Sequence, residues 1–167
     1  MSFMPWSATF EFGIPEIDEQ HRQLVAITNT LHDTILHEGA RSVSIGPTLE
    51  KLVNYTQSHF TSEEALLEAR DYAEIEEHKA EHDRFILKII DLCKRHENEE
   101  AIALEMLEFL KIWLIHHICR VDRAYLPYFS TDPQEGPAED NTLSGSPRAW
   151  RPIRVAYYAA INKTSCL

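Results

Sequence analysis

The sequence predicts an all-α protein: an antiparallel up-down-up-down four-helix bundle with an N-terminal arm and a C-terminal extension. The chain of 167 residues is 44% hydrophobic and 26% charged, which is a globular composition and enough for one domain with a core. Four segments of about 20 to 25 residues carry apolar side chains at the three-and-four spacing of an amphipathic helix. Because their connections are short, consecutive helices should run in opposite directions.

The first two helices have recognisable ends. The first is expected over residues 18–38, with Asp18 as its N-cap and Gly39 ending it. The second opens at a Gly-Pro pair, because Pro47 suits the first turn of a helix, and continues to Arg70. Both carry Leu, Ile, Val and Phe on one stripe, so each should turn that stripe towards a core.

The other two helices complete the bundle. The third is expected over residues 72–96. The fourth should start from an N-cap at Asn98, because Glu99 and Glu100 would then lie at the positive end of the helix dipole. It should end before Pro127, since the residue before a proline disfavours the helical conformation.

The bundle and its arm, residues 1–17, are expected to occupy residues 1–129. Residues 130–147 contain three Pro, two Gly and no aromatic residue, which predicts a flexible linker. Residues 148–167 are rich in Tyr, Ala and Ile and should form a short helix. We expect it to dock on the bundle, on a second copy of the chain or on a protein partner.

Charge and composition exclude several classes of protein. Residues 1–129 carry 12 Lys and Arg against 23 Asp and Glu, and this acidic body argues against nucleic acid as a partner. The chain has no apolar run long enough to span a bilayer and no signal-peptide pattern, so we expect no membrane insertion. Three widely spaced cysteines without a CxxC motif indicate free thiols and a cytoplasmic location.

Five of the nine histidines fall on or near the apolar stripes together with two carboxylates. HFTSE and HKAEH each place two such residues four apart, and HICRVD places a His and an Asp five apart. Side chains at i and i+4 share a helix face and can reach one metal ion or two adjacent ions. The candidate ligands are His21, His59, Glu63, His78, His82, His117 and Asp122.

Seven ligands are too many for one tetrahedral zinc ion, so a dinuclear site fits better. Taken singly, HKAEH fits metal binding and an exposed pair equally well, whereas His59 with Glu63, and Asp122 alone, are better explained as ordinary polar residues of a helix. Only their coincidence on four stripes favours metal binding. Four histidines have no partner at ligand spacing and are not expected to bind metal, namely His32, His37, His96 and His116. Glu64 is expected to be solvated.

These segments resemble the hemerythrin family, in particular the single-domain bacteriohemerythrins. The similarity covers about residues 6–129 and rests on WSATFEFGIPEIDEQHRQL, HFTSEE, HKAEHDRF and WLIHHICRVDRAY. The order of motifs, H, then HxxxE, then HxxxH, then HxxxxD, is specific. The chain departs from the family at Ala73, where proline is frequent, and at Leu67, where methionine is common. Neither departure removes a ligand.

The resemblance implies two iron ions joined by an oxo or hydroxo group, with dioxygen as the ligand. His21 and His59 would bind the iron that keeps an open position for dioxygen. Three histidines would bind the other iron and two carboxylates would bridge both: His78, His82 and His117, and Glu63 and Asp122. The implied function is reversible oxygen binding by a carrier, storage or delivery protein that is not an enzyme.

The surroundings of the ligands are expected to be dry. Five apolar residues should line the oxygen pocket: Leu24, Phe60, Trp113, Leu114 and Ile118. No proton donor is evident in the sequence near the ligands apart from the ligands themselves. A dry pocket would favour release of oxygen as the neutral molecule.

Three other functions remain open. The C-terminal extension suits an oxygen-sensing, iron-sensing or interaction module, because carriage alone does not require it. A di-iron oxidase or peroxidase is less favoured, since such bundles use paired Glu-x-x-His motifs and the sequence has none. A zinc hydrolase is least favoured because HExxH is absent.

The spacing of the last two candidate ligands is awkward for a regular helix. Five residues turn through roughly 500°, which would leave His117 and Asp122 about 140° apart around the helix axis. A local π-type turn between Ile118 and Val121 would bring them nearly into line, and such turns are frequent at functional sites. The sequence therefore predicts a widened turn at this point.

Overall fold

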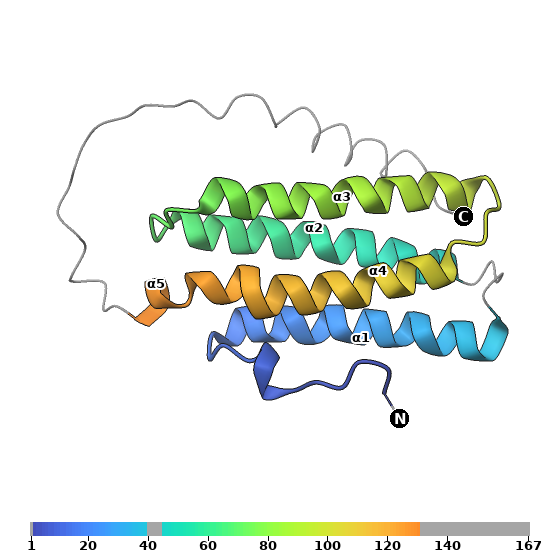
Figure 1. The fold of residues 1–167 in the computed structure, drawn as a ribbon, viewed down its shortest axis with the longest axis horizontal. Helices are drawn as coiled ribbons and strands as arrows, with labels where there is room; N and C mark the ends of the chain where they lie inside the picture. The colour runs from blue at the N-terminus through green and yellow to red at the C-terminus, as the bar shows by residue number, and fades with distance from the viewer. Residues whose placement is uncertain (1, 40–44, 131–167) are drawn as a thin grey trace.

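The computed structural model describes residues 2–39 and 45–130 and confirms the antiparallel four-helix bundle (Figure 1). Its long helices are α1 (Pro15–Glu38), α2 (Gly46–Glu68), α3 (Ile75–Glu97) and α4 (Ala103–His116). In the bundle, α1 packs against both α2 and α4, while α3 packs against α2. Within the described ranges, no helix is both long and apolar enough to cross a membrane.

Short elements flank the bundle at one end. The arm contains the single turn η1 (Ala8–Phe10), and α4 is followed directly by η3 (His117–Val121), η4 (Asp122–Tyr125) and α5 (Pro127–Ser130). The predicted extension and all of the predicted linker beyond residue 130 lie outside the described residues. The four helices enclose one continuous apolar core along the bundle.

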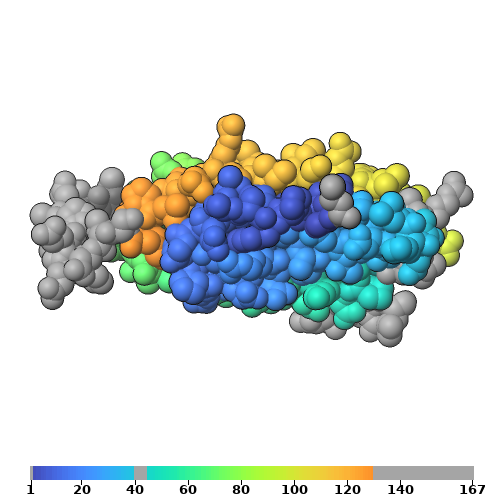
Figure 2. Space-filling view, turned by 90° about the horizontal axis from the view of Figure 1, so that it is seen from below, coloured from blue at the N-terminus to red at the C-terminus, as the bar shows by residue number. Residues whose placement is uncertain are grey.

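The N-terminal arm lies across α1 and the end of α4 (Figure 2). Asn29 holds it on α1, because its amide accepts a hydrogen bond from the Met4 N–H at 2.7 Å and donates one to the Met4 carbonyl at 2.9 Å. Phe10 is buried, and Arg123 donates to the Thr9 carbonyl at 3.0 Å. The arm is therefore part of the packed domain.

Two predicted helix starts are wrong. α1 begins at Pro15, with Ile14 as its N-cap, so Asp18 lies inside the first turns instead of capping the helix. Its buried carboxylate accepts hydrogen bonds from the N–H groups of Phe12 and Gly13, at 2.7 and 3.0 Å, and so holds the arm against the helix start. Asn98 is the C-cap of α3, not the N-cap of α4.

The connections explain the remaining differences in helix ends. Glu99 has a left-handed φ of 61° and turns the chain between α3 and α4, which delays the start of α4 to Ala103. Asp71, with φ 52°, turns the chain between α2 and α3, so α2 ends at Glu68 and α3 begins at Ile75. The predicted end of α1 at Gly39 is confirmed, and so is the place of Pro47 in the first turn of α2.

Replacing Asp18 by alanine should lower the free energy of unfolding by about 3 kcal/mol or more, since it removes two hydrogen bonds to a charged group that contribute about 1.5–3 kcal/mol each. Urea denaturation at matched metal content measures the loss. Glu19→Ala is the control, because Glu19 is exposed and accepts a hydrogen bond from Gln23, one turn further along the same helix. Equal losses in the two variants would show that Asp18 does not anchor the arm.

Candidate metal centre

All seven candidate ligands lie at the end of the bundle where α1 and α3 begin and where α2 and η3 end (Figure 1). Each is almost completely buried, with no more than 2% of its surface exposed. Three of the four long helices contribute: the ligands are His21 on α1, His59 and Glu63 on α2, and His78 and His82 on α3. His117 and Asp122 lie on η3 and η4, which follow α4 directly. The structure thus brings these residues together at one level of the bundle.

The side chains form two groups that share one carboxylate. Glu63, His78, His82 and His117 make one group, and His21, His59 and Glu63 make the other; within each, the potential ligand atoms lie within 4.8 Å of one another. The Glu63 Oε2 atom is 3.2 Å from His78 Nε2 and 3.3 Å from His82 Nε2. A carboxylate in this position can serve two adjacent cations.

Asp122 lies between the same two groups. Its Oδ2 atom is 3.1 Å from His21 Nε2, and its Oδ1 atom is 3.0 Å from His117 Nε2. The turn that places it there is η3, a π-helix from His117 to Val121, so the predicted widened turn is confirmed. The carboxylate consequently points into the core and is fully buried.

Several buried polar atoms at this centre have no well-formed hydrogen bond to any residue that the structure describes. They are His21 Nε2, His59 Nε2, His78 Nδ1, His117 Nδ1, and both carboxylate oxygens of Asp122. An unpaired buried polar atom costs about 1–3 kcal/mol, and an unpaired charge costs more. The ε nitrogens and carboxylate oxygens lie close together in the two groups, and a cation bound within each group would satisfy them. The donor set therefore fits two metal ions with nitrogen and oxygen ligands.

Burial and neighbouring charges set the protonation of the centre. Burial lowers the pKa of His59 to about 4 and also lowers the pKa of His117. Burial alone would raise the pKa of Glu63 and of Asp122, but the adjacent imidazoles lower both below their ordinary values. The neutral imidazole and the ionised carboxylate are the forms that bind metal.

Two of the ligand histidines form hydrogen bonds through Nδ1 with side chains that the sequence did not single out. His82 donates from Nδ1 to Oε1 of Glu64 at 2.7 Å, so the expectation that Glu64 is solvated is wrong. His59 donates from Nδ1 to Oε1 of Gln20 at 2.8 Å. Glu64 follows Glu63 directly and points about 100° away around α2, towards α3, which is why it meets the outer edge of His82.

Tyr125 is a further residue that the sequence did not reveal. Its hydroxyl donates to Oε1 of Glu63 at 2.7 Å, and the side chain is completely buried. Burial and the nearby carboxylates raise its pKa well above 10, so it keeps its proton at neutral pH. The expectation that no proton donor other than the ligands lies near the centre is therefore wrong, although this donor is already paired with Glu63.

Aromatic rings cover the three-histidine group. Phe60 stacks on His82 with ring centroids 3.8 Å apart, and Trp113 stacks on His117 at 4.2 Å. The five residues predicted to line a pocket are all buried in one apolar cluster: Leu24, Phe60, Trp113, Leu114 and Ile118.

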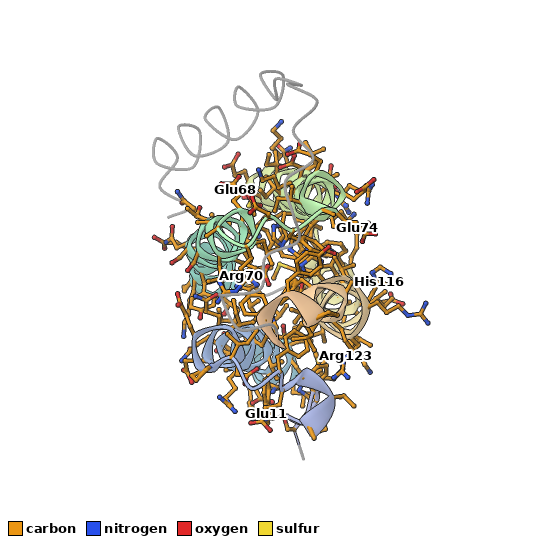
Figure 3. All side chains as sticks on the ribbon, turned by 90° about the vertical axis from the view of Figure 1, so that its left-hand side faces the viewer. Glu11, Glu68, Arg70, Glu74, His116 and Arg123 are labelled. Atoms are coloured by element: carbon orange, nitrogen blue, oxygen red, sulfur yellow. The ribbon has the colours of Figure 1, made fainter. Side chains whose placement is uncertain are left out.

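The four remaining histidines belong to neither ligand group in the described part of the chain. His116 projects outward from α4, away from the bundle interior (Figure 3). His32 stacks on Phe3 of the arm, and His37 and His96 are at least partly exposed. That none of the four binds metal stays a prediction.

Comparison with known proteins gives a consistent result. The family model "Hemerythrin HHE cation binding domain" matches residues 13–129. The bacteriohemerythrin of Methylococcus capsulatus is 38% identical over 133 residues, covering 78% of this chain and 99% of that protein. The bacteriohemerythrin of Pseudomonas aeruginosa is 34% identical over 126 residues, covering 75% and 81%.

A solved structure of wild-type hemerythrin superposes with a TM-score of 0.71 at 34% identity, covering 78% of this chain and all of that one. Sequence, fold and the buried cluster of imidazoles and carboxylates thus agree over the whole bundle. The chain belongs to the hemerythrin family, whose members bind a pair of irons.

Proposed function

We propose that this protein binds dioxygen reversibly at a non-haem pair of irons held by the seven buried ligands. The observation that carries the proposal is the sharing of Glu63 by two groups of imidazoles, with Asp122 lying between them. Two adjacent cations with common carboxylate ligands account for every imidazole and carboxylate in the cluster. Hemerythrins are oxygen-binding proteins and not enzymes, which supports the same function here.

The two halves of the centre differ in the number of imidazoles they offer. His21 and His59 form the half with two, and the other half has three. The two-histidine half therefore has a coordination position to spare, and this is where a small ligand would bind. The irons would supply the electrons for reversible oxygen binding.

The surroundings favour binding over chemical conversion. The Phe60 ring lies beside both halves, with its centroid 3.8 Å from that of His82 and 5.5 Å from that of His59. A charged oxygen species leaving past this apolar side chain would lose its hydration. Oxygen then leaves more readily as the neutral molecule. The Tyr125 hydroxyl donates to Glu63 and holds that carboxylate in place.

Removing one ligand should lower the iron content. We expect His59→Ala and His82→Ala to fall from about two irons per chain towards one or none, because each loss leaves other polar groups of the core unpaired. Elemental analysis measures the iron per chain. His96→Ala and His116→Ala are matched controls that should keep the wild-type content. Unchanged iron in both ligand variants would contradict the assignment.

Oxygen binding should be reversible in the visible spectrum. The reduced, iron-loaded protein should gain absorption bands on admission of air, lose them under argon and regain them over repeated cycles. Irreversible bleaching in the first cycle, or turnover of an added reductant, would favour an oxidase or peroxidase over a carrier.

Deleting residues 131–167 should leave the iron content and the reversible spectrum unchanged, because all seven proposed ligands precede the deletion. Elemental analysis and the air–argon cycle test both. A change confined to the elution volume on gel filtration would assign these residues to an interaction with another chain. Loss of iron would instead show that they stabilise the bundle.

A further inference from the structure

The two ligand histidines whose Nδ1 atoms bond to a side-chain oxygen belong to different halves of the centre. His82, in the three-histidine half, donates to the carboxylate of Glu64, and His59, in the two-histidine half, donates to the amide oxygen of Gln20. Among the described residues, the Nδ1 atoms of His78 and His117 have no hydrogen-bond partner, while His21 has the backbone of Phe10 as a partner. Each half of the centre thus has one imidazole anchored by a side chain, and these two side chains differ in charge.

Both anchors leave the inner nitrogen free to bind metal. A carboxylate or an amide oxygen can only accept, so the proton must lie on Nδ1 of each ring. The lone pair then lies on Nε2, which faces Glu63 at 3.3 Å in His82 and at 3.8 Å in His59. The hydrogen bonds at Nδ1 are therefore closely similar in the two halves, with nitrogen-to-oxygen distances of 2.7 and 2.8 Å.

The charge of the hydrogen-bond acceptor changes how strongly the imidazole donates electrons to the metal. A carboxylate draws the Nδ1 proton towards itself and makes the ring a stronger electron donor, whereas a neutral amide does so much less. Glu64 is only 7% exposed, and His82 is completely buried, so water screens this pair poorly. A stronger donor stabilises the more oxidised metal ion.

We propose that Glu64 and Gln20 are positioning residues that make the two halves of the centre electronically unequal, so that the His82 half favours the ferric ion. This inference rests on the proposed pair of irons. It means that when an external one-electron oxidant takes an electron from the fully reduced protein, the electron leaves the His82 half first. Gln20 keeps the His59 half, where a position is open, in the ferrous form for longer.

Reciprocal substitutions test the inference. Glu64→Gln and Gln20→Glu exchange an oxygen for an NH₂ group, or the reverse, at nearly constant volume, and each retains an oxygen that can accept the Nδ1 proton. Glu68→Gln is the control, since it makes the same change of charge one turn further along α2, where the side chain pairs with Lys79 at the surface. Iron per chain is measured first for all proteins.

The readout is a spectroelectrochemical titration of the iron-loaded proteins, which resolves the two one-electron steps. Glu64→Gln should weaken the preference for the ferric ion in the first step by about tenfold, the lower end of the effects typical for partners behind a metal ligand. Its first step therefore moves to a more positive potential. Gln20→Glu should move the second step to a more negative potential. Both changes bring the two steps closer together, while the mean potential moves in opposite directions.

A purely structural anchor would behave differently. Because the replacing glutamine still accepts the hydrogen bond, Glu64→Gln would then keep the wild-type potentials and alter only thermal stability. Unchanged separation of the steps in both variants, or shifts equal to those of Glu68→Gln, would overturn the inference while leaving the proposed function intact. Fewer than two irons per wild-type chain would overturn both.

Discussion

The rest of the structure depends on one constraint: two carboxylates and five imidazoles are removed from water inside a helical bundle. Taking a charged group into such an interior costs several kcal/mol unless opposite charge and hydrogen bonds replace the lost water. Glu63 and Asp122 have imidazoles around them, but neither oxygen of Asp122 has a well-formed hydrogen bond to any described residue. Cations resolve this imbalance, so metal binding and the stability of this end of the bundle are coupled.

The number of residues per helical turn explains why the chain changes from an α-helix to a π-helix at the end of α4. On a regular helix Asp122 would point well away from His117, towards solvent. The π-turn of η3 adds about one residue to a single turn and brings both side chains to the same face. It also shifts the register of everything that follows, and Tyr125 consequently enters the core and meets Glu63. One local rearrangement thus places a ligand and the residue that orients another ligand.

Local spacing determines what could be predicted from the sequence. The helices, the i and i+4 pairs and the widened turn all follow from periodicity within single segments. Glu64 and Gln20 could not be assigned in this way, because each acts on a histidine of a neighbouring helix and nothing in its own segment shows which helix lies alongside. The capping role expected for Asp18 failed for a related reason, since its partners are backbone groups of an irregular arm. Asn98 lies in the turn between α3 and α4, and asparagine is common both at the end of one helix and at the start of the next. The sequence alone therefore did not show that it is the C-cap of α3.

The two ends of the bundle have different roles: one end stabilises the fold, and the other carries the candidate ligands. Away from the ligands the core is made of fully buried aliphatic side chains such as Leu31, Leu49, Ile89 and Met106. Burial of this surface provides most of the driving force for folding, whereas the polar end contributes little of it. Packing at the apolar end thus fixes the direction of each helix. Because the helices are stiff, this direction also determines where their ligand residues lie. The positions of the imidazoles are therefore imposed by the bundle, and the anchors behind His59 and His82 are left free to differ in charge without altering the geometry.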